Sequence, residues 1–125
     1  MIDWSRLVPP GERARQERAL LRDRIRHARD RALAGGVAFD GVRFHTDDSG
    51  QGRITAAALA AMLDPGAVVN WKTMDGGFVA LEAGRILAIA RGVRAHVQAC
   101  FDREAALLAA LETGPVPDIE SGWPG

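Results

Sequence analysis

The chain has 125 residues, enough for one domain that buries a hydrophobic core without disulfides or a structural metal. Hydrophobic residues make up 47% of it and aromatic residues 6%, so alanine and leucine provide most of the apolar side chains and favour helices. The single cysteine, Cys100, excludes an internal disulfide, and no apolar run reaches the roughly 18 residues of a membrane span. With a formal net charge of zero and no hydrophobic leader, we expect a soluble protein that is not exported.

The N-terminal region combines an arm with an arginine-rich helix. Residues 1–10 form the arm, which carries Trp4, and a helix is predicted from residue 11 to about residue 33, where Gly35 and Gly36 end it. One face of this helix is an apolar seam of Ala14, Leu21, Ile25, Ala28 and Ala32. About 80° round the helix lies an arginine stripe, Arg15, Arg18, Arg22, Arg26 and Arg29. Residues 11–33 hold eight arginines against four acids, a balance of +4, whereas residues 100–125 hold five acids against one arginine, a balance of −4.

Two β-hairpins on either side of a short helix are predicted next. Asp40-Gly41 supplies the positive φ angles of a type I′ turn, and the second turn contains Asp75-Gly76-Gly77. Thr46-Asp47-Asp48 offers caps for the helix. The first hairpin spans residues 37–45, the helix residues 54–63, and the second hairpin has strands at residues 68–72 and 78–81. Four such strands predict one small antiparallel sheet with helices on one face, an α+β fold.

The last helix, predicted from about residue 82 to residue 113, carries the clearest periodic signal in the sequence. Its seam alternates spacings of four and three and only Glu104 interrupts it: Ile86, Ala90, Val93, Val97, Cys100, Glu104, Leu107 and Leu111. About thirty residues give a rod of roughly 45 Å, longer than the ~36 Å diameter of a compact domain of this size. The rod therefore needs a cover, either the first helix packed antiparallel or a neighbouring subunit. Gly92 inside it indicates a bend or a close approach of another segment.

Residues 114–125 form a tail with three prolines and three glycines, which predicts an extended chain. Trp123 lies in this tail as Trp4 lies in the arm. Each tryptophan is either folded back on the core or an anchor for another chain. The sequence thus divides into the arm of residues 1–10, a single α+β domain of residues 11–113 and the tail of residues 114–125.

No group of residues predicts catalysis, a metal site or a cofactor site. His96 and Cys100 have the spacing of two zinc ligands on one helix, but no further ligand supports them and Cys100 falls on the apolar seam. Asp47 and Asp48 lack the ligand alternation of a calcium loop and its glutamate at the twelfth position, so they are interpreted as helix caps. We therefore expect a protein that is not an enzyme and holds no cofactor.

Four stretches within about residues 29–112 resemble a known family: RALAGGVAFDGVRFHTDD, RITAAALAAM, NWKTMDGGFVAL and AHVQACFDREAAL. Together they are similar to a domain of unknown function that recurs in tail-fibre and tail-fibre-assembly proteins of tailed bacteriophages and prophages. The closing ESGWPG is similar to endings of tail-fibre assembly proteins. The resemblance implies a fibre component or a small protein that helps fibres fold or attach, with no active-site residues. It also implies a location in the host cytoplasm during assembly or in the virion tail.

The first functional hypothesis is therefore a non-enzymatic phage tail protein, either an assembly chaperone or a structural piece, that acts by docking. Its partner would be a tail-fibre or other tail protein, bound by Trp4 and Trp123. The long helix would pack against the same helix of other copies in a homo-oligomer. A trimer would match the symmetry of a fibre. The residues of this oligomer seam are Ile86, Val93, Val97, Leu107 and Leu111.

The alternative hypothesis is a nucleic-acid-binding accessory protein that uses the arginine stripe. The arginine-rich first helix departs from the family pattern, which leaves open what this segment binds. Glu12, Asp23 and Asp30 line the next face of that helix, no aromatic residue stands among the arginines, and the overall charge is zero. A solvated face or an acidic protein partner is therefore the favoured interpretation of the stripe.

Overall fold

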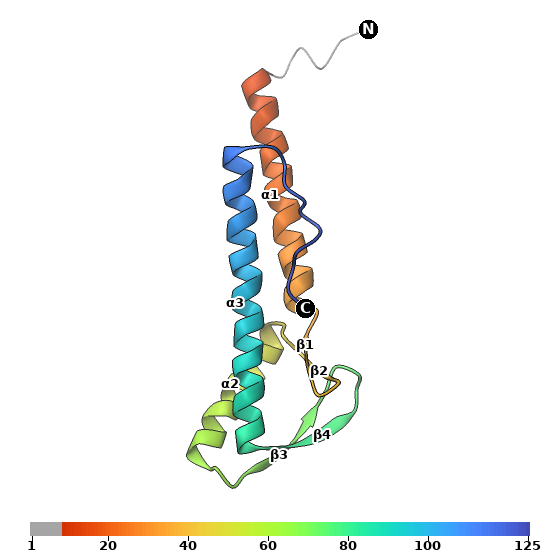
Figure 1. Ribbon diagram of the computed structural model, residues 1–125, viewed down its shortest axis with the longest axis vertical. Coiled ribbons are helices and arrows are strands. Elements are labelled where there is room, and N and C mark those ends of the chain that lie inside the picture. Colours follow the sequence, from red (N-terminus) through yellow and green to blue (C-terminus); the bar gives the residue numbers. More distant parts are fainter. Residues whose placement is uncertain (1–8) are drawn as a thin grey trace.

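Residues 9–125, which the computed structural model describes, form three α-helices and two β-hairpins in an α+β fold (Figure 1). In chain order the elements are α1 (Pro10–Ala34), β1 (Val37–Phe39), β2 (Val42–Phe44), α2 (Asp48–Leu63), β3 (Val68–Lys72), β4 (Phe78–Glu82) and α3 (Ala83–Thr113). The predicted fold class and the long terminal helices are confirmed. Trp4 and the rest of the arm before residue 9 lie outside the described residues. Within that part of the chain, no helix combines the length and apolarity that a membrane crossing requires.

Helix α3 runs the length of the molecule and is covered within the chain (Figure 1). Helix α1 packs beside its second half in the opposite direction, while α2 and both hairpins gather around its first half. The tail of residues 114–125 contains no helix or strand, and it turns back along α1 and α3. Of the two covers that the sequence left open for the long helix, the structure shows the antiparallel first helix.

Two hydrophobic cores follow one another along α3. The hairpin core joins α2 and the hairpins to the first half of α3, and its buried residues are Phe44, Ile54, Ala61, Leu81, Ala83, Ile86, Ile89 and Val93. The helix-pair core joins α1 and the tail to the second half, and its buried residues are Ile25, Ala28, Leu107 and Ile119. Because α3 contributes to both, it ties two separately packed ends into one body.

The predicted oligomer seam belongs to these cores. Ile86 and Val93 are buried in the hairpin core, and Val97 packs against it. Leu107 is buried in the helix-pair core, and Leu111 packs against that one. Elements of the same chain therefore cover the seam. The sequence could not show which cover it has, because a periodic apolar face looks the same whether a helix of the same chain or another copy packs on it.

The hairpins form two separate two-stranded sheets and not the one small sheet that was predicted. The first pairs Val37 with Phe44, and its turn has φ angles of 50° at Asp40 and 77° at Gly41, as the type I′ prediction requires. The reason for the separation is how the hairpins meet. The Met74 N–H in the turn of the second hairpin donates to the Arg43 carbonyl over 2.9 Å, so a turn and not a strand edge reaches the first hairpin.

Helix α2 begins at Asp48, six residues before the predicted start. Asp47 is its N-cap, with a carboxylate that accepts from the Gly50 N–H over 2.8 Å. Gly50 lies in the first turn because the chain before the helix passes close by, and a Cβ there would come within 2.6 Å of the Cβ of His45. This glycine is therefore required by packing.

A close approach explains the glycine inside α3. The ring of Phe39 lies directly against Gly92, so that a Cβ at this position would overlap the ring. Phe39 also packs edge-to-face on Phe44, with 6.2 Å between ring centroids. Of the two explanations predicted for Gly92, the structure shows the approach of another segment, and this contact docks the first hairpin on the helix.

Candidate docking groove

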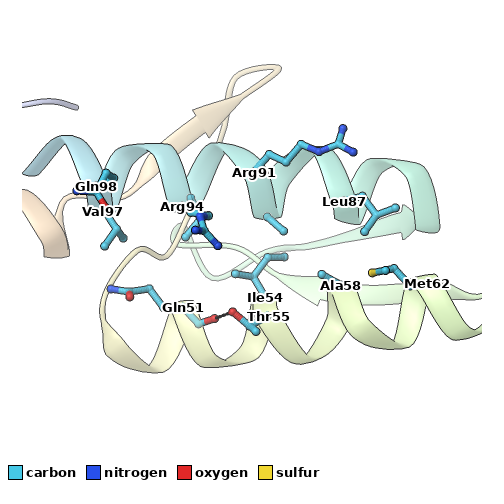
Figure 2. Close-up of a pocket in the computed structure, with 12 residues that line it drawn as sticks. Gln51, Ile54, Thr55, Ala58, Met62, Leu87, Arg91, Arg94, Val97 and Gln98 are labelled. Carbon is cyan, nitrogen blue, oxygen red and sulfur yellow. Dashed lines mark hydrogen bonds between the residues drawn. The ribbon is translucent and has the colours of Figure 1, made fainter.

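An open groove of about 540 Å³ lies between α2 and α3 (Figure 2). Its lining comes from one face of each helix at helical spacing: Gln51, Ile54, Thr55, Ala58 and Met62 from α2, and Leu87, Ala90, Arg91, Val93, Arg94, Val97 and Gln98 from α3. In Figure 2, Gln51 lies at the same end as Gln98, and Met62 at the same end as Leu87. The helices are therefore antiparallel here, and the twelve residues of each, 51–62 and 87–98, give a groove of about three turns, roughly 16 Å long.

The floor of the groove is apolar and small. Ile54 and Val93 are 3% and 2% exposed and belong to the hairpin core. Ala58 and Ala90 above them are only half-buried, because alanine side chains do not fill the space between the helices. At one end Met62 leaves 68% of its surface exposed. An apolar side chain from another molecule would find contact and lose water here.

The neutral polar residues of the groove make hydrogen bonds within the chain. The Gln51 side-chain amide donates to the Thr46 carbonyl over 2.9 Å, and the Thr55 hydroxyl donates to the Gln51 carbonyl over 2.8 Å. Gln98 donates to the Asp102 carboxylate over 3.0 Å. These three side chains therefore have a donor already engaged inside the molecule.

Two positive charges at the rim are free. Arg91 and Arg94 are exposed, and neither makes an ion pair or hydrogen bond with any of the described residues 9–125. In Figure 2 the Arg94 side chain points into the space between the helices. No Asp, Glu, His or Cys lines the groove among the described residues, so it carries a charge of +2 and no general acid or base. The arrangement is suited to binding an anionic, apolar partner.

The arginine stripe of α1 is largely neutralised inside the chain. The Nη1 atom of Arg29 donates to both carboxylate oxygens of Glu104, over 2.9 and 2.8 Å, and the guanidinium lies 5.3 Å from the centroid of the Phe101 ring. The hydrogen bonds that Arg29 donates to Asp30 and Glu104 raise the pKa of Arg29 above its usual value. Its side chain is only 20% exposed. Glu104 therefore interrupts the apolar seam because it binds a cation of the neighbouring helix.

Three other arginines of the stripe also have carboxylate partners. These pairs are Arg15 with Glu12 at 2.5 Å, Arg26 with Asp23 at 2.5 Å, and Arg22 with Glu112 at 3.8 Å. Arg18 is the member of the stripe with no such partner among the described residues. Glu12 and Asp23 belong to α1 itself, whereas Glu104 and Glu112 belong to the C-terminal region, and both kinds of pair reduce the charge available to phosphates.

The C-terminal tryptophan is folded back on the core. Trp123 packs against the helix-pair core, and its indole N–H donates to the Ile119 carbonyl over 2.7 Å. Glu120 of the same segment pairs with Arg31 at 2.7 Å and with Arg24 at 3.5 Å. The structure therefore gives Trp123 an internal role, the first of its two predicted interpretations.

His96 and Cys100 lie together at the junction of the two cores. The His96 Nε2 is 2.9 Å from the Ala32 carbonyl and 3.7 Å from the Cys100 sulfur. Cys100 is fully buried, and burial raises the pKa of its thiol. Within residues 9–125, no group of three or more His, Cys, Asp or Glu residues has the geometry to hold a metal ion.

Sequence reasoning missed the groove although its signals are present. Arg91 and Arg94 stand three apart on α3, next to the small and apolar positions 87, 90 and 97. The missing information was the other wall, since the predicted short helix lacked its first turns and hence Gln51. Without that wall, these arginines looked like ordinary surface charges.

A family model described as a domain of unknown function (DUF4376) matches residues 16–121 of the chain. The match includes most of α1, all of its arginine stripe except Arg15, and much of the tail, so it extends beyond the stretches that carry the sequence resemblance. Comparison with curated proteins and with solved structures finds no match.

Proposed function

The chain belongs to the DUF4376 family, and from this premise we propose that it is a non-enzymatic bacteriophage tail protein that docks onto a partner in tail-fibre assembly or attachment. Two kinds of support lead to this proposal. The sequence resembles a domain found in tail-fibre and tail-fibre-assembly proteins. The groove between α2 and α3 has the composition of a docking surface.

The observation that carries the docking role is the contrast between the groove and the rest of the molecule. The seams of α1 and α3 are buried within the chain, and most of the arginine stripe is paired. The groove combines an apolar floor, an exposed methionine and two cations that are unpaired among the described residues. Its lining contains no Asp, Glu, His or Cys, which supports binding over acid–base catalysis at this groove.

The test is the solution mass by light scattering, for the chain alone and mixed with the product of the adjacent tail-fibre gene. We expect a complex with the fibre protein. Replacement Met62→Lys should weaken it about tenfold or more, because the groove loses an apolar contact and gains a third positive charge. A complex that persists with the mature fibre indicates a structural component, and one that forms only with the unassembled fibre indicates a chaperone.

The matched control is Leu63→Lys. Leu63 neighbours Met62 on α2 and is 78% exposed, but it does not line the groove. This variant has the same charge change and should bind like the original chain. If the fibre protein does not bind at all, the tail role is wrong; if both variants bind equally, the groove is not the docking site.

A further inference from the structure

We infer that the groove between α2 and α3 receives an acidic amphipathic helix of a partner protein, whose apolar side lies on the floor and whose carboxylates pair with Arg91 and Arg94. The inference rests on the proposed docking function and names the chemistry of the partner.

The shape of the groove favours a helix. Two antiparallel helices that diverge on one side leave a trough into which a third helix packs by fitting side chains between theirs. The trough is about three turns long, roughly 16 Å, so apolar residues spaced three and four apart on the occupant would follow its floor. The small side chains of Ala58 and Ala90 allow the backbone of the occupant to come close.

The charges of the groove favour an acidic occupant. Arg91 and Arg94 lie about one turn apart on α3, roughly 4.5 Å along its axis, and both lack a carboxylate among the described residues. Carboxylates spaced three or four apart on the incoming helix would match that separation. Because the other polar residues of the lining already have internal hydrogen-bond partners, these two arginines are the groups left to select the charge of the partner.

The same features disfavour a nucleic acid. No aromatic residue lines the groove among the described residues, so bases would find no surface to stack on. A phosphate backbone has no apolar side to place on Ile54, Ala58 and Val93.

A second copy of this chain is also a poor occupant. The acids that face outward on its long helices are largely engaged, such as Glu12 with Arg15, Asp23 with Arg26 and Glu112 with Arg22. On α1 the exposed large hydrophobic residue is Leu20 alone, which does not make an apolar side. The partner is therefore a different protein.

The test uses two labelled model peptides, each about four helical turns long, with the same leucine-rich side. One carries glutamates beside the leucines and the other carries lysines at the same positions. Fluorescence anisotropy measures their binding to the full chain. We expect the glutamate peptide to bind, the lysine peptide to bind at least about tenfold more weakly, and the difference to shrink as salt is raised.

The deciding variant is Arg91→Glu with Arg94→Glu, which should lower the affinity for the glutamate peptide about tenfold or more and raise that for the lysine peptide. Its control is Arg18→Glu with Arg53→Glu. Both control positions are exposed arginines outside the groove, so this variant has the same net charge but should bind both peptides like the original chain. Circular dichroism of both double variants checks that their helices are intact.

Several results would overturn the inference. Equal binding of both peptides, no binding of either, or equal losses in the two double variants would each do so. Displacement of the peptide by a single-stranded oligonucleotide would assign the groove to nucleic acid, and a homodimer abolished by Arg91→Glu with Arg94→Glu would assign it to a second copy. The peptide experiment does not involve the fibre protein. If the proposed tail role is wrong, the mixture with the fibre protein shows no complex, whereas if the proposed acidic helix is wrong, the peptide measurements show it.

Discussion

Gly92 shows how a single position sets the packing of a whole hairpin. In an exposed helix, alanine in place of glycine adds about 1 kcal/mol of stability. Here the ring of Phe39 occupies the place of the side chain. We therefore expect Gly92→Ala to lower the free energy of unfolding by about 1–3 kcal/mol, since the first hairpin must move away from α3. Urea denaturation followed by circular dichroism measures this change.

Gly84 provides the matched control on the same helix. A Cβ at Gly84 meets nothing within 4 Å, so Gly84→Ala should leave stability unchanged or raise it slightly. Adding Phe39→Leu to Gly92→Ala should recover part of the loss, because leucine leaves room for the new methyl group. A Gly92→Ala protein as stable as the original would contradict the contact.

At the scale of elements, the pairing of α1 with α3 depends on Leu107, which is 1% exposed in the helix-pair core. A carboxylate buried there costs several kcal/mol. We expect Leu107→Asp to release α1 and the tail, while α2, the hairpins and the first half of α3 keep their own core. Hydrogen exchange with mass spectrometry should show loss of protection in α1 and little change in α2.

The neighbouring exposed position gives the control for this prediction. Ala106→Asp adds the same charge to α3 but should cost only about 0.7 kcal/mol of helix propensity. The solution mass of the Leu107→Asp protein should equal that of the original chain. A lower mass for the Leu107→Asp protein would support the predicted oligomer seam. Loss of protection throughout the chain would mean that the two cores do not unfold separately.

The sequence predicted those elements whose ends depend on local chemistry. Asp40-Gly41 set the first turn, and Gly35 and Gly36 ended α1, since positive φ angles and helix stops are properties of a few neighbouring residues. The early start of α2 was not predicted. Gly50 is needed in its first turn because His45 packs against it, and this contact is not visible in the sequence. The sequence also did not predict that the hairpins form two separate sheets, or that a groove lies between α2 and α3. Both features depend on contacts between distant segments. Periodicity shows that a face is covered but does not show by what.

On the scale of the whole molecule, the tail closes the end where α1 and α3 pair, and Asp118 organises it. Its carboxylate accepts from the Ser121 hydroxyl over 2.5 Å and from the Glu120 N–H over 3.0 Å, and these bonds lower the pKa of Asp118 below its usual value of about 4. A lowered folded-state pKa gives stability that is complete above the ordinary pKa and is lost as pH falls through the folded value. The tail should therefore loosen below about pH 4.

The indole N–H resonance of Trp123 reports this change, because that group donates to the Ile119 carbonyl. In an acid titration we expect its signal to move toward that of a solvated indole as the tail loosens. Asp118→Ala should show the loosened signal already at neutral pH. Asp75 also has a lowered pKa, held by Thr73 and the Gly77 N–H, but it lies in the turn of the second hairpin. Asp75→Ala should leave the Trp123 titration as it was, and a shared response would contradict a local role for Asp118.

The pair between Arg29 and Glu104 joins residues 75 positions apart, and this separation has a consequence for synthesis. At about 5–20 residues per second, the ribosome makes Glu104 roughly 4–15 seconds after Arg29. During that interval α1 has no partner, and its many charges keep it in solution. The hairpins, α2 and the first half of α3 lie closer together in the chain, and the contact of Phe39 with Gly92 is complete before Glu104 is made. A nascent chain thus makes the whole lining of its groove, which ends at Gln98, before it makes Leu107 and the other residues that hold its first helix.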